Sequence, residues 1–315
     1  MSGYVLGIDG GGTKTELLLA DRSGTIVAHV LGAGINPMDN PEWHRNLAAT
    51  LTAAAKFSCD AATVGIAGYA EVPALDATVR RGVAELLTIP HDILNDVYLA
   101  HEAAFPDGVG ILLVAGTGSM VVAGNGDARF RVGGWGDQIG DEGSAYWIGR
   151  ETLNRLTHVL DGRLIAPAFE EALRQDLALP DGDPLSVLLD WLTSAPHSRS
   201  AIAALSLGTE ERAGRGEPIS AAIIAAATEH LAQLVTTART RTGLHRDAPW
   251  SGYGGLMSSS YIRTGLDRRL GQSMTLPLLP PACGALCRAA RKAGWSIDAA
   301  WTERLLKSLV DSSPV

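Results

Sequence analysis

The chain has 315 residues, of which 46% are apolar and 19% charged, which predicts a globular protein of two domains rather than a disordered chain. Its 26 basic and 34 acidic residues give a net charge of −8, which argues against binding to nucleic acid or an anionic membrane. We find no uncharged apolar window of membrane-spanning length, no signal peptide, and too few cysteines for a disulfide framework. We therefore expect a cytoplasmic protein.

The first half of the sequence alternates strands and helices. Apolar runs at Tyr4–Ile8, Lys14–Ala20 and Thr25–Leu31, separated by glycine turns, predict a β-meander. Helices and strands then alternate up to Gly110, where a second hairpin begins. After Gly133 the pattern is mainly helical. We place the domain boundary at residue 115, with the domains at 1–115 and 116–298.

An internal echo links the two halves. GIDGGGTKTELLLA (Gly7–Ala20) and LLVAGTGSMVVAG (Leu112–Gly124) each read as an apolar strand, a small-residue turn and a second apolar strand. The similarity suggests an ancient duplication.

The segment Asp9–Thr15, DGGGTKT, is the sharpest motif. Three consecutive glycines let backbone N–H groups approach an anion, and Asp9 at the strand end can hold a hydrated Mg²⁺. A plain hairpin turn with a solvated lysine is the alternative. The pattern is neither a P-loop nor a dinucleotide fingerprint. The residues expected at the phosphates are Gly11, Gly12, Thr13, Lys14 and Thr15.

A second turn, Gly116-Thr117-Gly118-Ser119, follows the strand Ile111–Ala115. Its two hydroxyls suit another phosphate contact, although an ordinary two-residue hairpin explains the sequence as well. Asn95-Asp96 stands between a short strand and a helix. From position alone Asp96 is either a helix N-cap or a general base at a cleft.

The loop Gly133–Ser144 combines five glycines, three carboxylates and an indole. Trp135 can stack on a sugar face while Asp141 or Glu142 accepts hydroxyl hydrogen bonds, and Asp141 can alternatively cap the following helix. A later turn, Gly252–Ser258, suits a flat adenine ring or is simply a strand–helix connection. The histidines lack zinc-protease spacing, and no nucleophile elbow occurs.

The ordered motifs DGGGTKT, ND, GTGS, GGWGDQIGDEGS and GYGG resemble the BadF/BadG/BcrA/BcrD-type ATPases, and within them the N-acetylglucosamine kinase branch. The resemblance implies two ribonuclease H-like domains of the actin/hexokinase/Hsp70 fold around an ATP cleft. It also implies transfer of phosphate from ATP, with Mg²⁺, to an amino sugar, usually at O6, by a homodimer. The helix Ala299–Val310 is expected to return to the first domain.

The resemblance also implies roles for individual residues. Asp96 matches the catalytic base, Asn36 a sugar-binding asparagine, and Pro218–Thr242 the helix behind the adenine. Further candidates for sugar binding are Asn95, Ser119, Gly134, Trp135, Gly136, Asp141 and Glu142. Those for the nucleotide are Gly11–Thr15, Gly116, Thr117, Gly118, Gly254, Gly255 and Ser258.

Three alternatives stay open. A glucosamine or N-acetylmuramic acid kinase of the same family needs, respectively, an extra carboxylate or an arginine near the sugar, and the sequence places neither. An ATP-driven activator of a dehydratase or CoA-ester reductase needs cysteines for an iron–sulfur cluster, and only Cys59, Cys283 and Cys287 are present. A sugar-responsive regulator needs a DNA-binding domain, which the net charge disfavours.

Overall fold

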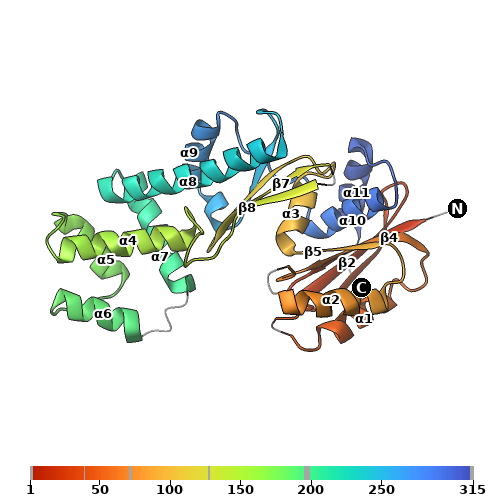
Figure 1. Ribbon diagram of the computed structural model, residues 1–315, viewed down its shortest axis with the longest axis horizontal. Coiled ribbons are helices and arrows are strands. Elements are labelled where there is room, and N and C mark those ends of the chain that lie inside the picture. The colour runs from red at the N-terminus through yellow and green to blue at the C-terminus, as the bar shows by residue number, and fades with distance from the viewer. Residues whose placement is uncertain (1–2, 39, 71–72, 127, 195–198, 313–315) are drawn as a thin grey trace. The chain divides into compact units, whose positions relative to one another are not determined.

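The described residues form two β-sheets with helices packed on them, in a computed structural model of the whole chain (Figure 1). The structure describes residues 3–38, 40–70, 73–126, 128–194 and 199–312. Contacts within the chain divide it into two units. Unit 1 comprises residues 1–110, 124–128 and 276–315, and unit 2 comprises residues 111–123 and 129–275.

Unit 1 is built on a five-stranded sheet. Its strands are β1 (Tyr4–Gly10), β2 (Lys14–Asp21), β3 (Ile26–Ala33), β4 (Cys59–Ile66) and β5 (His91–Leu94). The spatial order is β3-β2-β1-β4-β5, with β1 antiparallel to β2 and parallel to β4. This confirms the meander expected from the first three apolar runs.

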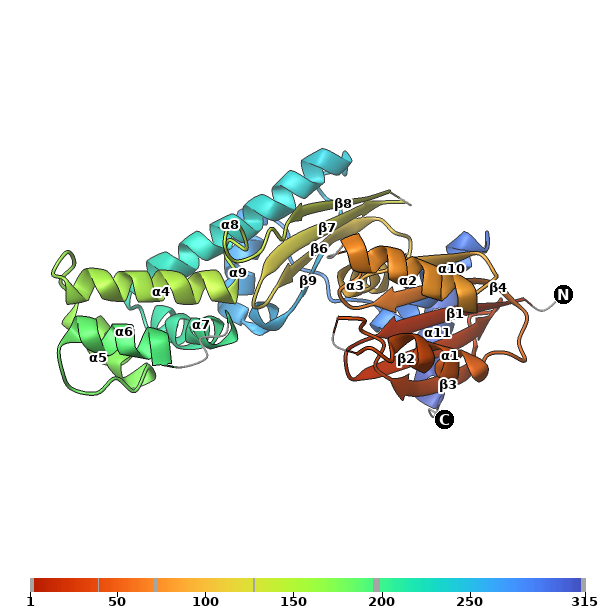
Figure 2. The ribbon, with the colours of Figure 1, turned by 60° about the horizontal axis from the view of Figure 1, so that its bottom comes forward.

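Alternation along the strands gives the sheet of unit 1 two apolar faces. Side chains of a strand point alternately to either side, so Leu6 and Ile8 enter one core and Val5 the other. Five helices cover these faces (Figure 2): α1 and α2 on one side, and α3, α10 and α11 on the other. Their bounds are α1 (Trp43–Thr52), α2 (Pro73–Leu86), α3 (Asp96–Ala104), α10 (Pro281–Lys292) and α11 (Ala299–Asp311).

The return of the chain to unit 1 begins earlier than the sequence boundary at residue 298 indicates. Helix α10 buries Cys283, Leu286 and Cys287 in the same core as Val5 and Leu18. Its small residues allow a close approach, since a Cβ at Gly284 would lie 2.5 Å from the backbone nitrogen of Ala103. Residues 276–298 therefore belong with the first sheet.

Unit 2 repeats the strand plan of unit 1. Its strands are β6 (Gly110–Ala115), β7 (Ser119–Asn125), β8 (Ala128–Gly133) and β9 (Trp250–Tyr253). Their order, β8-β7-β6-β9 with β6 parallel to β9, matches β3-β2-β1-β4 (Figure 2). The similar hairpin sequences Gly7–Ala20 and Leu112–Gly124 thus occupy equivalent places in the two sheets.

The rest of unit 2 is helical. Its helices are α4 (Ala145–Leu160), α5 (Pro167–Asp176), α6 (Pro184–Ser194), α7 (Arg199–Gly214), α8 (Pro218–Thr242) and α9 (Ser260–Leu270), with a short 3-10 turn η1 (Gly255–Ser258). By length and composition alone α8 is able to cross a membrane, which the sequence analysis did not detect. In the structure it packs against α4, α7 and α9 and buries Ile224, Leu231 and Val235, as a core helix does.

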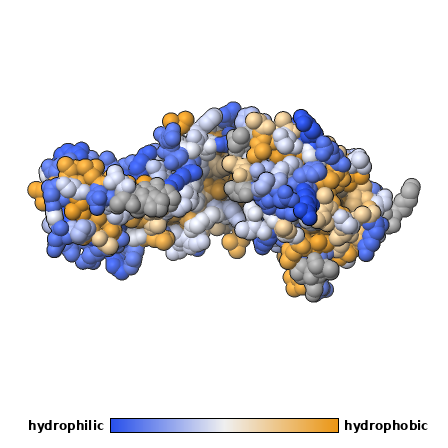
Figure 3. Space-filling model, turned by 90° about the horizontal axis from the view of Figure 1, so that it is seen from below, coloured by the Kyte–Doolittle hydropathy of each residue, from blue (hydrophilic) through white to orange (hydrophobic). Residues whose placement is uncertain are grey.

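Helix α6 exposes an apolar stripe. Leu185, Leu189 and Leu192 are spaced by four and three residues, so they share one side of the helix, and all three are exposed. Hydrophobic surface is visible at this end of unit 2 in Figure 3. Such a stripe is typical of a protein contact surface.

A substitution at Gly7 of β1 tests how closely α10 packs on the first sheet. In Gly7→Ala the new Cβ would lie 2.8 Å from Ala282 O and Leu286 N, which are backbone atoms and cannot rotate away. We expect a loss of about 1–3 kcal/mol in unfolding free energy, measured by thermal or denaturant unfolding. Gly214→Ala is the control, because no atom lies within 4 Å of its added Cβ. Equal stability of both variants would contradict the close approach.

Candidate active site

The first glycine turn connects β1 to β2. The Gly11 amide donates to Lys14 O at 3.0 Å, and Gly12, Thr13 and Lys14 are exposed. The following strand connection packs directly under the turn, since a Cβ at Gly34 would lie 2.0 Å from Gly12 O. The turn therefore has a fixed backbone and an open outer side.

Asn36 lies beside this turn, because the Ile35 and Asn36 amides both donate to Gly11 O, at 3.0 and 3.3 Å. Its side-chain oxygen accepts from Met38 N at 3.0 Å.

Thr15 is different from the other expected phosphate ligands. It is fully buried and its hydroxyl donates to Ala33 O at 2.7 Å, so it anchors β2 to the end of β3.

Three carboxylates interact electrostatically near the end of β1. Burial is the main cause that raises the pKa of Asp9, the negative charges of Glu16 and Asp96 raise it further, and Lys14 lowers it. Asp96 reaches this region because β1, β4 and β5 are parallel, which brings their carboxyl ends to one edge of the sheet. The edge therefore has excess negative charge that one lysine only partly offsets.

Local geometry shows which residue of the Asn95-Asp96 pair caps helix α3. Asn95 is the N-cap of α3, since its side chain accepts from Tyr98 N at 2.9 Å, and it is 6% exposed. Asp96 is the first residue of the helix and is exposed, with one carboxylate oxygen 3.0 Å from Val97 N. Asn95 thus performs the capping, and the Asp96 carboxylate faces solvent.

The second glycine turn, Gly116–Gly118, connects β6 to β7 in unit 2. Its carbonyl oxygens accept from the first amides of α4, Ala145 N at 2.8 Å and Tyr146 N at 3.4 Å. Thr117 is exposed, whereas Ser119 is 3% exposed and donates its hydroxyl to Glu142 O at 2.8 Å. Thr117 is available to a ligand, and Ser119 connects the turn to the acidic loop.

Gly254 stands at the equivalent end of β9. Its φ is +101°, and a Cβ there would lie 2.5 Å from Ala115 O, so no other residue fits. The two turns border a cavity of about 550 Å³. The lining includes Gly116, Thr117, Gly255, Ser258 and, from α7, Ser200, Ala203, Leu207 and Glu210.

The helix that lines this cavity is α7. Among the described residues, α7 contributes lining side chains and α8, the helix Pro218–Thr242, contributes none. Sequence patterns missed α7 because its lining residues are mostly small or polar and form no motif. Glu210 is its one charged lining residue, and it accepts a hydrogen bond from Ser259.

The acidic loop Gly133–Ser144 is folded back through glycines with positive φ at 133, 134, 136 and 143. Trp135 is 74% exposed, whereas Asp141 is 3% exposed and has a φ of +57°. Ser144, not Asp141, caps α4, because its hydroxyl oxygen accepts from Trp147 N at 3.1 Å. The Asp141 carboxylate accepts from Ser119 N at 3.4 Å and pairs with Arg199.

Two arginines that were not predicted from the sequence border the acidic loop. Arg131, on β8, donates to Gly133 O at 3.1 Å and also to Gly134 O. Arg199 opens α7 and pairs with Asp141 from 58 residues away in the sequence. Neither belongs to a motif, so only the folded chain reveals them.

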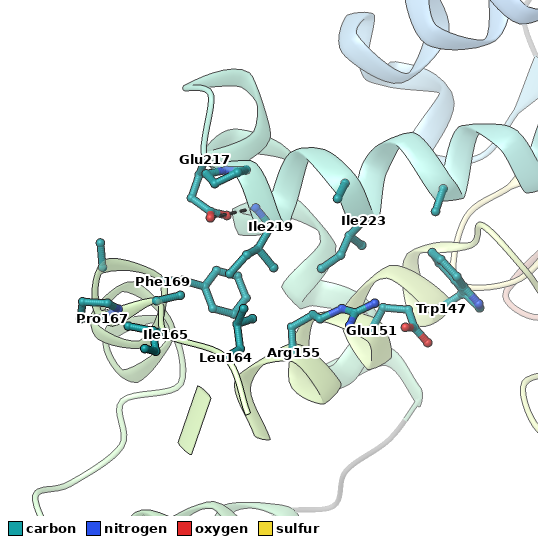
Figure 4. A pocket seen from close by; sticks show the side chains of 15 residues that line it. Trp147, Glu151, Arg155, Leu164, Ile165, Pro167, Phe169, Glu217, Ile219 and Ile223 are labelled. Atoms are coloured by element: carbon teal, nitrogen blue, oxygen red, sulfur yellow. Dashed lines mark hydrogen bonds between the residues drawn. The ribbon is translucent and has the colours of Figure 1, made fainter. Parts of the chain in front are cut away.

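A second, apolar groove of about 680 Å³ lies between α4, the start of α5 and α8. Phe169, Ile219 and Ile223 point into it from two sides (Figure 4). Apart from the helix Pro218–Thr242, no residue expected at the nucleotide or the sugar lines this groove, so we do not assign it to the candidate site.

No cluster of three or more His, Cys, Asp or Glu side chains spaced to hold a metal ion occurs in the described part of the chain. Buried thiols also argue against a cysteine-ligated cluster. Burial raises the pKa of Cys59 to about 11 and of Cys283 to about 12, and that of Cys287 still higher. Cys283 and Cys287 are buried and Cys59 is half-buried, a setting typical of structural thiols rather than of reactive thiolates.

The two sheets and their paired glycine turns have the architecture of the actin/hexokinase/Hsp70 fold. A solved candidate N-acetylglucosamine kinase from Chromobacterium violaceum matches with a TM-score of 0.62 and 25% identity over 90% of this chain and 98% of that one. A hexokinase of the ROK type from Thermus thermophilus matches with a TM-score of 0.52 at 18% identity, over 91% and 97% of the two chains.

The chain belongs to the BadF/BadG/BcrA/BcrD ATPase family, whose model matches residues 6–289. The N-acetylmuramic acid/N-acetylglucosamine kinase of Clostridium acetobutylicum is 26% identical over 239 residues, 72% of this chain and 76% of that protein. The N-acetyl-D-glucosamine kinase of Dictyostelium discoideum is 27% identical over 263 residues, 77% and 81% of the two chains.

Because the pKa of Asp9 is raised, we expect that replacing its charged carboxylate by a neutral side chain stabilises the folded chain, and that this stabilisation depends on pH. The folded chain disfavours the charged carboxylate, so the stability linked to this group is present below its unfolded pKa of about 3.8 and is lost as pH rises through the folded pKa. Asp9→Asn should therefore raise the melting temperature at neutral pH, and the gain should shrink as pH falls towards that value. Glu303→Gln, at an exposed site on α11, is the control. A lower melting temperature for Asp9→Asn at neutral pH would contradict this account.

Proposed function

We propose that the chain is an ATP-dependent kinase that phosphorylates an amino sugar, N-acetylglucosamine or glucosamine, at its O6 hydroxyl. The observation that carries the proposal is that one turn, Gly116–Gly118, borders both a cavity of a size suited to a nucleotide and Asp141 of the acidic loop. Two relatives that are named as kinases of N-acetylglucosamine or N-acetylmuramic acid support the choice of substrate.

The nucleotide would be held by backbone and small side chains. Its base and ribose fit the cavity beside Gly255 and Ser258, where Glu210 offers a hydrogen-bond acceptor. Its phosphates would accept from the exposed Gly12 and Thr13 amides, Lys14 and the Thr117 hydroxyl. In phosphoryl transfer the protein mainly positions the reactants and stabilises phosphate charge, which is the role we propose for these groups.

Asp96 would orient the sugar hydroxyl and accept its proton as the hydroxyl oxygen attacks the γ-phosphorus. Asn95 is the N-cap of α3, and the exposed Asp96 carboxylate accepts, among the described residues, only from Val97 N, through one of its two oxygens. Asn36, the glycines around Trp135, and Asp141 would bind the remaining sugar hydroxyls. General-base assistance of this kind contributes roughly 10²- to 10⁴-fold to rate.

Mg²⁺ fits the carboxylate edge of unit 1. Asp9 lies in a field of negative charge from Glu16 and Asp96 that a cation would relieve. Mg²⁺ is usually held by one or two carboxylates, several waters and substrate phosphates, so a single carboxylate at this place suffices. Asp9 would hold the hydrated ion, which when bound offsets charge on the transferring phosphate.

N-acetylmuramic acid is a second candidate substrate, and Arg131 favours it. Two carbonyls of the acidic loop fix the guanidinium beside Gly134, and no carboxylate pairs with it among the described residues. A fixed guanidinium without an anionic partner suits the carboxylate of a lactyl group. The iron–sulfur activator alternative has no such support, given the buried thiols.

The remaining partners are also proposals. A homodimer follows from the family resemblance, and the apolar stripe of α6 is a surface that a second subunit would cover. A cytoplasmic location, without nucleic acid or membrane as partner, agrees with the net charge of −8.

Asp96→Asn separates catalysis from stability. The change keeps size and shape but removes the proton acceptor, so kcat should fall by about two orders of magnitude or more while the melting temperature stays near that of the wild type. Asn95→Ala is the complement, because loss of the N-cap should cost about 0.5–2 kcal/mol of stability. A kcat within a few-fold of wild type in folded Asp96→Asn would remove Asp96 from the mechanism. Asp137, Asp141 and Glu142 would then be the candidates for the base.

Lys14→Ala should raise the KM for ATP far more than the KM for the sugar, because the lysine follows the phosphate turn and is exposed there. Steady-state kinetics with each substrate varied in turn measure both constants. Lys56→Ala, at another exposed lysine, is the control. An unchanged KM for ATP would show that Lys14 is simply solvated.

A panel of hexoses, amino sugars and their N-acetyl forms in a coupled ADP-release assay tests the substrate. We expect N-acetylglucosamine or glucosamine to be the best acceptor. If N-acetylmuramic acid is also turned over, Arg131→Gln should lower kcat/KM for it at least about tenfold more than for N-acetylglucosamine, as expected for a lost charge-assisted bond. Arg150→Gln, at an exposed site on α4, controls for lost surface charge. Turnover confined to non-amino sugars, or none at all, would overturn the proposed function.

A further inference from the structure

Arg199 is a charged residue at the candidate site that the proposed mechanism leaves without a role. It is the first residue of α7, and its guanidinium pairs with the buried carboxylate of Asp141. Asp137 of the same loop lies 4.0 Å from its Nε. The side chain remains 41% exposed, so an incoming anion can reach it.

The pairing engages the carboxylate that is expected to bind the sugar. One oxygen of Asp141 accepts from Ser119 N at 3.4 Å and the other is held by Arg199. The residue is 3% exposed and has a φ of +57°, a backbone conformation that the loop must enforce. With both oxygens occupied and little exposure, Asp141 offers a sugar hydroxyl poor access in this arrangement.

Arg199 also touches the second glycine turn. A Cβ at Gly118 would lie 2.7 Å from its Nη2 and 2.9 Å from an Asp141 oxygen, so guanidinium, carboxylate and turn meet at one point. The neighbouring turn residues Gly116 and Thr117 line the cavity together with Ser200, which follows Arg199 in the helix. The guanidinium therefore lies close to both the turn that borders the cavity and the acidic loop.

We propose that Arg199 is a positioning residue that couples nucleotide binding to sugar binding. The proposal rests on the proposed function. Phosphate oxygens beside the turn compete with Asp141 for the guanidinium, which has five N–H donors and can bind phosphate in a bidentate fashion. As Arg199 turns to the phosphates, one oxygen of Asp141 becomes available to a sugar hydroxyl. Nucleotide thus prepares the sugar site.

Coupling of this kind is reciprocal. If nucleotide increases the affinity for sugar by some factor, sugar increases the affinity for nucleotide by the same factor, and such factors are typically about 5–150. Without the guanidinium the two ligands should bind independently. Without the Asp141 charge the guanidinium keeps, among the described residues, only the longer contact with Asp137, so nucleotide should bind more tightly than to the wild type while the coupling disappears.

The test is calorimetric titration of N-acetylglucosamine into the full chain, with and without a saturating non-hydrolysable ATP analogue and Mg²⁺. We expect the analogue to lower the wild-type sugar Kd at least about fivefold. In Arg199→Gln we expect equal sugar Kd values in both titrations. Arg215→Gln, in the turn that follows the same helix, where Arg215 pairs with exposed Glu211, should behave as wild type.

Asp141→Asn and the nucleotide titrations distinguish coupling from a structural role. A merely structural ion pair predicts that Asp141→Asn lowers stability and weakens nucleotide binding, whereas coupling predicts tighter nucleotide binding. Wild-type coupling that persists in Arg199→Gln, or nucleotide binding weakened in Asp141→Asn, would overturn the inference alone. Nucleotide binding without binding of any amino sugar would overturn the proposed function and the inference with it.

Discussion

Parallel strand pairing is the constraint on which the candidate site residues of each unit depend. The carboxyl ends of parallel strands meet at one edge of a sheet, and in unit 2 the pairing of β6 with β9 brings the Gly116 and Gly254 turns together. Contact is so close that a Cβ at Gly254 would strike Ala115 O. In unit 1 the same pairing of β1, β4 and β5 gathers Asp9 and Asp96. Backbone geometry thus positions residues that are far apart in sequence.

Local patterns in the sequence were sufficient to predict the elements and the glycine turns. Continuous apolar runs between glycine turns identify β1 and β2, and the motif order led to a family that the family model confirms. Individual side chains were harder to assign. The expected ligands Thr15 and Ser119 donate their hydroxyls to backbone carbonyls instead, because both residues are buried at the edges of their turns. No local pattern distinguishes a hydroxyl that faces a ligand from one that closes a turn.

The other features that the sequence did not predict depend on contacts between residues far apart in the chain. The Asp141–Arg199 pair joins residues 58 positions apart, and α10 lies against a strand at the other end of the chain. Such contacts depend on how whole elements pack, which composition and spacing do not encode. The domain boundary expected at residue 298 reflects the same limit, since nothing in Pro281–Lys292 itself indicates which sheet its apolar side covers.

Unit 1 is built from segments at both ends of the chain, and this affects the order in which the chain folds during synthesis. Val5 and Leu18 emerge from the ribosome early, yet the residues that cover them, among them Leu286 and Trp301, are among the last to be made. All of unit 2 is translated in between. Domains generally fold as units while synthesis proceeds, so unit 2 can complete its core first. One face of the first sheet meanwhile stays uncovered, and this nascent surface is where a chaperone would be needed.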